Sequence, residues 1–435
     1  MSRLQDLLDK LCPNGVPYKP LWEVTYWDKK FNGVDRIKQP KVISYPYLLA
    51  KDMKALEREN GNVTLLSTGE YVGLTTEEIA GNNLCEGEVV TMPWGGTVKG
   101  IKYHKGKFVT ADNRIATSRD TTVLNNKFLY YIFLHQSDLI QSFYRGAGIQ
   151  HPNMNNVLNM LIPVPPIEVQ EEIVKILDRF AVYAAELQAE LQARKEQYEY
   201  YRNLLLTFNH SACGCGTDDK QDIKDQFTPP HWLNNVKIEW KTMGEIGTFI
   251  RGNGLQKKDF TETGVGCIHY GQIYTYYGTF ATETKSFVSN ELAKKLRKAK
   301  QGDIIIATTN ENVEDVGKAV AWLGKAEIAI SGDSYIYQHN QNPKFIAYQF
   351  QTERFLSFKK MNVTGTKVTR ISGENLEKFA IPLPPLEIQE KIVSILDRFE
   401  TLINDLSQGL PAEIAAVKEQ YEYYRNKLLT FKKIA

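Results

Sequence analysis

The feature that most constrains the fold is a long internal repeat. Residues 162–180 read IPVPPIEVQEEIVKILDRF, and residues 381–399 read IPLPPLEIQEKIVSILDRF. A second block, KEQYEYYRN, occurs at 195–203 and again at 418–426. Because both blocks recur in the same order about 220 residues apart, the repeated unit is half of the 435-residue chain. Such a duplication predicts two similar substructures related by internal pseudo-twofold symmetry.

The repeated segments have the periodicity of long helices. From Val169 onward, apolar and aromatic residues recur mostly at alternating steps of three and four, the heptad pattern of a coiled coil. In the second copy, Gly409 and Pro411 predict a break. Two such helices can pack antiparallel and hold domains at opposite ends, although each could instead only cover its own domain. The expected seam residues are Ile173, Phe180, Leu187, Leu191, Tyr198, Tyr201, Phe208, Ile392, Phe399, Leu406, Tyr421, Tyr424 and Phe431.

The first helical segment also contains a small repeat, AAEL at 184–187 followed by QAEL at 188–191. One four-residue unit lengthens a helix by about 6 Å, which is one or two base-pair steps of duplex DNA. Helix length can therefore set a distance. A run of good helix formers without functional meaning is the alternative.

Composition limits the class of protein. No stretch reaches the roughly 18 uninterrupted apolar residues of a membrane span, and the first residues have no apolar signal core, so we expect a cytoplasmic protein. The five cysteines are scattered, which does not indicate a disulfide framework. Cys213 and Cys215 near His210 are a weak metal-binding signal, and we interpret this segment as a linker without metal.

Charge differs between the repeated segments and the segments between them. Residues 16–160 contain 17 Lys and Arg against 14 Asp and Glu, and residues 236–380 contain 20 against 15. The repeated segments contain 5 against 8 at 161–208 and 7 against 8 at 381–435. Slightly basic variable segments and acidic repeated ones favour DNA contact in the former and protein contact in the latter.

The two variable segments differ in sequence but follow one plan. Lys127-Phe-Leu-Tyr-Tyr131 matches Lys344-Phe-Ile-Ala-Tyr348 as an amphipathic helix. Asp112 and Asp333 end two loosely matched strand-like runs, and a glycine-led loop follows at 146–151 and at 365–370. One α/β (α+β) fold whose surface loops have diverged is what a scaffold with loop-determined ligand choice predicts.

The duplicated Ile-Pro-x-Pro-Pro-[Ile/Leu]-Glu-x-Gln entry, the long repeated helices and the Ala-Glu-Leu quartets resemble the specificity (S) subunit of type I restriction–modification systems. The resemblance implies two α/β target-recognition domains separated by two long antiparallel coiled-coil helices. The domains implied are a first target-recognition domain at 1–160 with a short N-terminal helix at 2–12, a first spacer and docking helix at 161–208, a linker at 209–235, a second target-recognition domain at 236–380, and a second spacer and docking helix at 381–435.

The same resemblance implies the function and the partners. Each target-recognition domain would read one half of a bipartite, asymmetric sequence in double-stranded DNA. The helices would set the spacer between the half-sites and dock two modification (methyltransferase) subunits, which use S-adenosylmethionine to methylate adenine. Two restriction subunits would add ATP- and Mg-dependent translocation and cleavage. Such a protein would belong to the cytoplasm of a bacterium or archaeon.

The chain's own residues agree that catalysis lies elsewhere. We find no Gly-x-x-x-x-Gly-Lys-[Ser/Thr] phosphate loop, no dinucleotide-binding fingerprint and no metal-nuclease cluster, so we assign no catalytic residue and no metal. Two other functions remain open on the residues alone. One is a stand-alone DNA-modifying enzyme with duplicated DNA-binding halves, and the other is a structural coiled-coil adaptor.

Loop residues with basic, amide or hydroxyl side chains are the candidates for phosphate and base contacts. The candidate DNA-binding residues are Lys29, Lys30, Trp94, Thr97, Lys99, Arg145, Gln150, His151 and Asn153 in the first domain, and Arg251, Asn253, Lys257, Lys258, Asn310, Asn312, Thr366, Lys367, Thr369 and Arg370 in the second. The candidates for partner docking, which lie off the seam, are Glu196, Glu199, Tyr200, Glu419, Glu422 and Tyr423.

Overall fold

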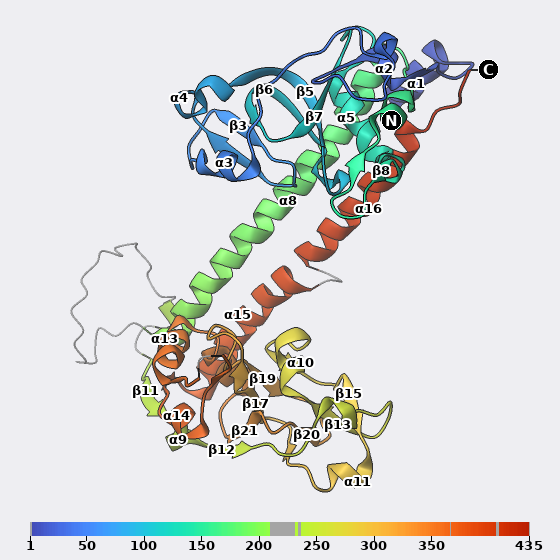
Figure 1. Cartoon of the computed structure of the whole chain (residues 1–435). Coiled ribbons are helices and arrows are strands. Elements are labelled where there is room, and N and C mark those ends of the chain that lie inside the picture. Colours follow the sequence, from blue (N-terminus) through green and yellow to red (C-terminus); the bar gives the residue numbers. More distant parts are fainter. Residues whose placement is uncertain (1, 209–230, 234–235, 366, 406–408, 435) are drawn as a thin grey trace. The chain divides into compact units, whose positions relative to one another are not determined.

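The computed structural model describes residues 2–208, 231–233, 236–365, 367–405 and 409–434 (Figure 1). The chain divides into two compact units. Unit 1 comprises Met1–Gln188 and Glu413–Ala435, and unit 2 comprises Ala189–Ala412. The division falls inside the second quartet of the first repeated helix, so each unit contains one variable segment together with parts of both repeated segments.

The centre of unit 1 is a six-stranded mixed sheet in the order β2-β7-β5-β6-β3-β4. Neighbouring strands are antiparallel except β3 and β6, which are parallel. Two small antiparallel pairs, β1-β10 and β8-β9, accompany it. The strands are β1 (Tyr18–Pro20), β2 (Thr25–Trp27), β3 (Val63–Leu66), β4 (Val72–Thr75), β5 (Cys85–Pro93), β6 (Lys102–Thr110), β7 (Asn113–Ser118), β8 (Tyr144–Arg145), β9 (His151–Pro152) and β10 (Leu161–Pro163).

Helices pack around this sheet, and α5 lies against β5 and β6 (Figure 1). The predicted amphipathic helix at 127–131 is confirmed as part of α5. The helices are α1 (Ser2–Leu11), α2 (Leu21–Val24), α3 (Ala50–Ala55), α4 (Glu77–Ala80), α5 (Asn126–His135), α6 (Ser137–Ser142), α7 (Met154–Asn159) and α8 (Ile167–Thr207), with 3-10 turns η1 (Arg36–Lys38), η2 (Gly81–Asn83) and η3 (Val98–Gly100).

The core of unit 1 includes the start of the first repeated helix. Ile173 and Leu177 of α8 are fully buried in one cluster with Phe128 and Phe133 of α5. Burying a side chain of this size contributes about 1.5–3 kcal/mol. The first turns of α8 are therefore part of the domain and fix the direction in which the helix leaves it.

Unit 2 is built around two sheets, with strand orders β12-β21-β17-β19-β14 and β15-β13-β20-β16. Two short antiparallel pairs, β11-β23 and β18-β22, complete it. The strands are β11 (Glu239–Thr242), β12 (Gly247–Arg251), β13 (Val265–Ile268), β14 (Phe280–Ala281), β15 (Ser286–Val288), β16 (Lys298–Ala299), β17 (Ile304–Ala307), β18 (Thr309–Asn310), β19 (Ala319–Trp322), β20 (Ile328–Ile330), β21 (Ser334–His339), β22 (Thr369–Arg370) and β23 (Ala380–Leu383).

The helix predicted from the match at 344–348 is confirmed as α12, which packs against β19 and α15. The helices and 3-10 turns of unit 2 are η4 (His231–Leu233), α9 (Met243–Ile246), η5 (Lys257–Asp259), α10 (Tyr270–Thr275), α11 (Asn290–Ala293), α12 (Pro343–Gln349), α13 (Glu353–Asn362), α14 (Gly373–Glu377) and α15 (Leu386–Asn404). The last helix, α16 (Leu410–Leu429), begins in unit 2 and lies mostly in unit 1. Cys213, Cys215 and His210 lie outside the described residues.

The variable segment begins and ends in the same way in both units. In unit 1, Tyr18 of β1 lies opposite Pro163 of β10, and in unit 2 Glu239 of β11 lies opposite Leu383 of β23. Each variable segment therefore begins and ends at one strand pair, directly before the repeated helix. This common plan agrees with the duplication seen in the sequence.

The predicted break in the second repeated helix is confirmed, because α15 ends at Asn404 and α16 begins at Leu410. Gly409 occupies a crowded position in the connection. A β-carbon there would lie 2.6 Å from the carbonyl oxygen of Thr401 and 2.7 Å from that of Leu402. Only glycine fits so close to this backbone without displacing it.

Candidate functional site

The repeated helices contact one another within each unit. In unit 1 the ring of Phe180 stacks on that of Tyr424 at 5.3 Å, and the Tyr183 hydroxyl donates to Glu413 at 2.6 Å. The partner number falls as the α8 number rises, so α8 and α16 run antiparallel in this contact. In unit 2 the ring of Tyr201 stacks on that of Phe399 at 5.7 Å.

The other expected seam residues are distributed between seam and core. Leu187, Leu191 and Tyr198 are each less than 8 % exposed, and Tyr421 is half-buried. Ile173 and Ile392 are fully buried, with Ile173 in the domain core rather than between the long helices. Leu406 lies outside the described residues.

The last seam position expected in each copy is not helical. α8 ends at Thr207, and Phe208 has a φ of 44°, a left-handed conformation that ends a helix. Likewise α16 ends at Leu429, and Phe431 leads into a bridge between Lys433 and Val16. Continued heptad spacing predicted these two seam positions, but both helices end before they reach them.

A repeated glutamine ties each long helix to its own domain. Gln170 accepts a hydrogen bond from the backbone N–H of Asn125 at 2.9 Å, and Gln389 accepts one from that of Asn342 at 3.1 Å. Each glutamine also donates to the carbonyl of a proline five residues earlier, at 2.7 and 2.9 Å. Both glutamines are fully buried. The same amide therefore bonds the residue just before α5 in one unit and α12 in the other.

A repeated aspartate makes the second tie. Asp178 accepts from Lys127 Nζ at 2.8 Å and from the Tyr131 hydroxyl at 2.5 Å. Asp397 accepts from Lys344 Nζ at 2.7 Å and from the Tyr348 hydroxyl at 2.8 Å. We call these two glutamines and two aspartates the helix anchors. Part of the internal repeat is thus required by the attachment of each helix to its domain.

A polar cleft of about 570 Å³ in unit 1 brings together residues that are distant in sequence. It is lined by residues 29–33, by Trp94, by Arg114 of β7, by Arg145 of β8 and by residues 151–155 from β9 to the start of α7. Six of the nine candidate DNA-binding residues of the first domain line this cleft. They are Lys29, Lys30, Trp94, Arg145, His151 and Asn153.

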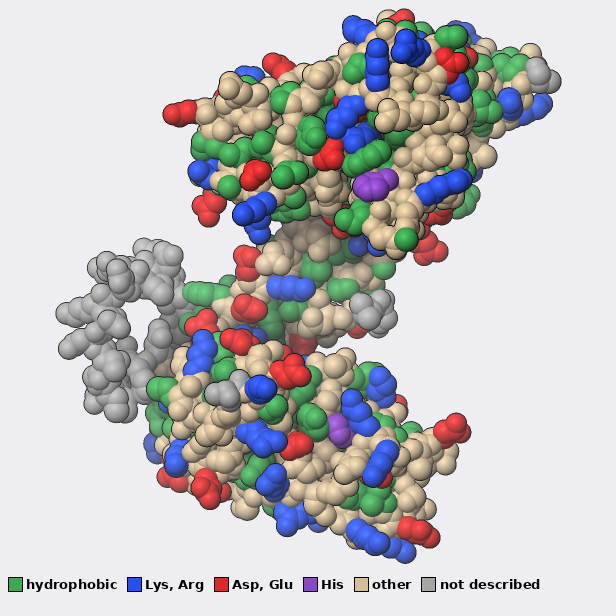
Figure 2. All heavy atoms as spheres, in the orientation of Figure 1, with side chains coloured by type: hydrophobic (Ala, Val, Ile, Leu, Met, Phe, Trp, Pro, Cys, Tyr) green, Lys and Arg blue, Asp and Glu red, His purple; other side chains and the backbone are tan. Residues whose placement is uncertain are grey.

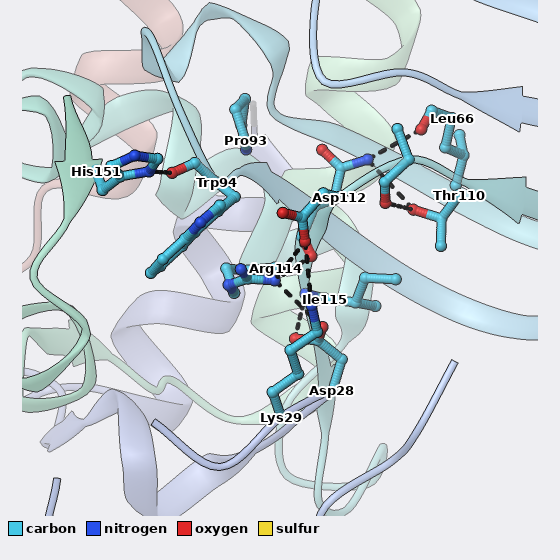
Figure 3. A network of polar contacts seen from close by, with 12 residues as sticks. Asp28, Lys29, Leu66, Pro93, Trp94, Thr110, Asp112, Arg114, Ile115 and His151 are labelled. Carbon is cyan, nitrogen blue, oxygen red and sulfur yellow. Dashed lines mark hydrogen bonds and ion pairs between the residues drawn. The ribbon is translucent and has the colours of Figure 1, made fainter. Parts of the chain in front are cut away.

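A buried arginine organises this cleft (Figure 3). Arg114 is 4 % exposed, and its guanidinium lies 3.9 Å from the centroid of the Trp94 ring. It pairs with Asp112 at 3.2 Å and with Asp28 at 3.7 Å. Lys29 also reaches Asp112 at 3.0 Å. A buried cation needs such partners because an unpaired one is strongly destabilising.

The carboxyl group of Asp28 is held in an unfavourable environment. Burial raises its pKa from 3.8 to about 6, against the opposing effects of the hydrogen bond from the Ile115 N–H and the charge of Arg114. The bond from the Ile115 N–H is 2.9 Å long. Asp28 therefore changes protonation near pH 6, next to the residues that line the cleft.

Arg114 was not among the sequence-based candidates, which were restricted to loops. The only local signal is its place in VTADNRIAT, where Arg114 follows Asp112 and Asn113 and directly precedes the apolar pair Ile115 and Ala116. The remaining candidates of the first domain, Thr97, Lys99 and Gln150, are exposed but do not line this cleft. A hydrogen bond from Gly96 N–H to the Gln150 carbonyl joins their loops at 3.0 Å.

In unit 2, the candidates at 251–258 fall into two groups. Arg251 donates to the Gly332 carbonyl at 3.2 Å, which brings it to the turn that ends in Asp333. Asn253 instead fixes a neighbouring loop through Lys295 and Arg297, at 2.9 and 2.8 Å. Its amide is thus already used within the fold. Lys257 and Lys258 are exposed in η5.

The other candidates of unit 2 lie around β18 and β22. Asn310 lies opposite Thr369, and Thr309 lies opposite Arg370, so candidates from two loops meet there. Asn312 is bonded to Asp315 in both directions at 2.8 Å. Lys367 is exposed, and Thr366 lies outside the described residues.

Strand register identifies equivalent positions in the two units. Thr25 of β2 lies opposite Ser118, and Gly247 of β12 lies opposite His339. Met92 lies opposite Arg114, and Ile306 lies opposite Tyr335. Counting along the strands from these pairs gives three equivalent pairs of positions, namely Lys29 with Arg251, Trp94 with Thr308, and Arg114 with Tyr335.

The same part of the fold therefore carries different chemistry in the two units. The tryptophan and arginine of unit 1 are replaced by threonine and tyrosine in unit 2, while a basic residue is present in both. On the face shown in Figure 2, Lys and Arg side chains are interspersed with Asp and Glu over both units. Local loops, rather than one continuous basic surface, thus distinguish the candidate regions.

The six candidates for partner docking are all exposed on α8 and α16. The tyrosines are the most notable, since Tyr200 is 49 % exposed and Tyr423 is 59 % exposed. Lys427 lies 5.7 Å from the centroid of the Tyr423 ring. No helix in the described part of the chain is long and apolar enough to cross a membrane.

The sequence of the chain matches a known protein family in two segments. Residues 46–196 and 235–416 match the type I restriction modification DNA specificity domain. A Haemophilus influenzae protein, provisionally named a type I restriction enzyme specificity subunit, is 28 % identical over 453 residues, covering 99 % of this chain and 100 % of that protein. The Escherichia coli EcoR124I/EcoR124II specificity subunit is 28 % identical over 318 residues, covering 71 % and 72 %.

Solved structures share the fold. The S subunit from M. genitalium has a TM-score of 0.52 at 14 % identity, covering 95 % of this chain and 96 % of that chain. A chain from a study of assembly and conformational transition of the type I R-M system has a TM-score of 0.53 at 17 % identity, covering 96 % and 98 %. With two matched segments spanning most of its length, the chain belongs to the family of type I restriction–modification specificity subunits.

Proposed function

We propose that each unit reads one half of a bipartite, asymmetric DNA site. The observation that carries this proposal is the register equivalence of the two units. The same positions at the ends of the same strands hold Lys29, Trp94 and Arg114 in one unit and Arg251, Thr308 and Tyr335 in the other. Two copies of one scaffold with unlike side chains at equivalent positions suit a site with two unlike halves.

Basic groups around the cleft of unit 1 suit phosphate contacts. Lys30 and Arg145 are exposed, and Lys29 is half-buried. Such contacts fix the register of a protein on duplex DNA, whereas amide, indole and guanidinium groups can read base edges. In unit 2, Arg251, Lys257, Lys258, Lys367 and Arg370 are exposed and suit the same role.

In this proposal, the long helices set the spacer between the half-sites and dock two modification subunits. The exposed glutamates and tyrosines of the repeated KEQYEYYRN blocks supply the same surface twice, which suits two identical partners. The modification subunits would bind S-adenosylmethionine and methylate adenine, and two restriction subunits would use ATP and Mg for translocation and cleavage. This chain would take no catalytic step, and the complex would act in the cytoplasm.

The test is to purify the chain with its modification subunits and expose the complex to a random duplex library with S-adenosylmethionine. Sequencing the methylated adenines reports both half-sites and the spacer. We expect two unlike half-sites at a fixed separation. Methylation without sequence preference would refute the reading role, and methylation by this chain alone would show that it is an enzyme.

A further inference from the structure

Both faces of the Trp94 ring in the unit 1 cleft are occupied by side chains. The Arg114 guanidinium lies 3.9 Å from the ring centroid. The His151 ring is 5.0 Å away, centroid to centroid, and tilted by 37°. Figure 3 shows the indole between these two side chains. A nucleotide base therefore cannot stack on Trp94 unless Arg114 or His151 moves.

What remains available is the edge of the indole. Its Nε1–H is a hydrogen-bond donor and cannot accept. Within the described ranges, no residue takes a hydrogen bond from this atom, although Trp94 is half-buried in the wall of the cleft. A donor that is held in place and unpaired is suited to an acceptor brought by a ligand.

The indole is also rigidly held. Ion pairs with Asp28 and Asp112, at 3.7 and 3.2 Å, hold the Arg114 guanidinium in place against the ring. On the other side, His151 Nδ1 is 2.8 Å from the Trp94 carbonyl oxygen, which ties the two loops together. A group preorganised in this way loses little conformational entropy when it binds.

We propose that Trp94 is a specificity-determining residue that donates from Nε1 to an acceptor on a base edge, and that Arg114 is its positioning residue. The proposal rests on the proposed function and names a contact within the half-site read by unit 1. In the major groove the acceptors are purine N7, guanine O6 and thymine O4. Cytosine presents its N4 amino donor there, so the contacted position should disfavour cytosine.

The decisive variant is Trp94→Phe, which keeps an aromatic ring over Arg114 and removes the donor. The matched control is Trp240→Phe in unit 2. Trp240 also lies against an arginine, with Arg354 4.1 Å from its ring centroid, but it belongs to β11, next to β23 rather than the cleft. Both variants are assayed as complexes with the modification subunits on the randomised duplex library.

We expect Trp94→Phe to reduce discrimination against cytosine about 3- to 10-fold at one position of one half-site. The other half-site and the spacer should be unchanged, and Trp240→Phe should leave both half-sites as in the wild type. Arg114→Lys keeps a cation beside Asp28 and Asp112 but loses the planar stack. It should relax the same position, with base preferences elsewhere retained.

Two results would overturn the inference. One is a uniform loss of binding by Trp94→Phe with every base preference intact, which would make Trp94 a purely structural residue. The other is relaxation in both half-sites. A wild-type complex without two half-sites would instead refute the proposed function itself. If Arg114→Lys does not fold, Trp94→Phe still decides the matter.

Discussion

The helix anchors predict that one substitution has unequal effects in the two repeats. Asp178 and Asp397 are equivalent, and each accepts hydrogen bonds from a lysine and a tyrosine. In the second copy the Tyr348 hydroxyl also contacts Glu400 at 2.7 Å. The first copy has Ala181 at the position of Glu400. Removal of the aspartate should therefore leave Tyr131 without an acceptor but leave Tyr348 with one.

The size of the difference follows from burial. Tyr131 is 2 % exposed, and a buried hydroxyl that loses its partner costs about 1–3 kcal/mol. The lysine–aspartate pairs are partly exposed, with Asp178 31 % and Asp397 29 % exposed, so each contributes at most about 1 kcal/mol. Asp178→Ala should destabilise the anchor by about 1–4 kcal/mol. Asp397→Ala should cost about 1 kcal/mol, because Tyr348 keeps Glu400.

Hydrogen exchange read by mass spectrometry on the full chain separates the two sites, because α5 and α12 give different peptides. Asp178→Ala should raise exchange in α5 (Asn126–His135), and Asp397→Ala should raise exchange in α12 (Pro343–Gln349) less. The double variant Asp397→Ala/Glu400→Ala should bring α12 to at least the level of α5. Equal effects of the two single variants, or a double variant no worse than Asp397→Ala, would refute the reasoning.

Two further predictions concern the cleft and the spacer. The pKa of Asp28 is about 6 in the folded state and 3.8 as the ordinary value, so the folded state binds this proton more tightly than the unfolded state does. The resulting contribution to the free energy of unfolding is complete below about pH 4 and is lost as pH rises to about 6, a fall of about 3 kcal/mol in all. Urea unfolding between pH 4 and 7.5 should show this fall in the wild type relative to Asp28→Asn, and identical pH profiles would contradict it. Deleting Gln188 to Leu191 removes about 6 Å of helix and should shorten the preferred spacer by about one base pair. Altered half-sites in the library assay would show that the helix does not set the distance.

Much of the fold could be predicted because its signals are local. Heptad spacing, the Gly409 and Pro411 break and the matched Lys-Phe blocks correspond to α8, the α15–α16 break, α5 and α12. Loop composition also selected six residues that line one cleft, and two of the segments involved follow β2 and β5, which both pair with β7. Whether any of these residues contacts DNA stays a prediction.

The rest depends on contacts between distant parts of the chain. Arg114 is organised by Asp28, a residue 86 positions away, and no local pattern indicates that pairing. Asn253 resembled a base-reading amide, but Lys295 and Arg297 use its side chain. Phe208 continued the heptad spacing, yet the helix ends before it. For Arg114 and Asn253, residues distant in the sequence determine what the side chain contacts, and no pattern within one segment indicates such a contact.

The helix anchors explain part of the internal repeat without any partner protein. Repetition of Gln170 and Asp178 as Gln389 and Asp397 is explained within the molecule, because each pair attaches a helix to its own domain. The repeated tyrosines Tyr200 and Tyr423 are not part of that attachment, although each makes an edge contact with the tyrosine that follows it, at 5.5 and 5.2 Å. Tyr200 and Tyr423 are exposed at the same place in the KEQYEYYRN block, and a large aromatic side chain facing solvent adds little to a helix by itself. Tyrosine is enriched at sites that dominate protein interfaces. The exposed part of the repeat, rather than the repeat as a whole, is therefore what supports the proposal of two identical docking surfaces.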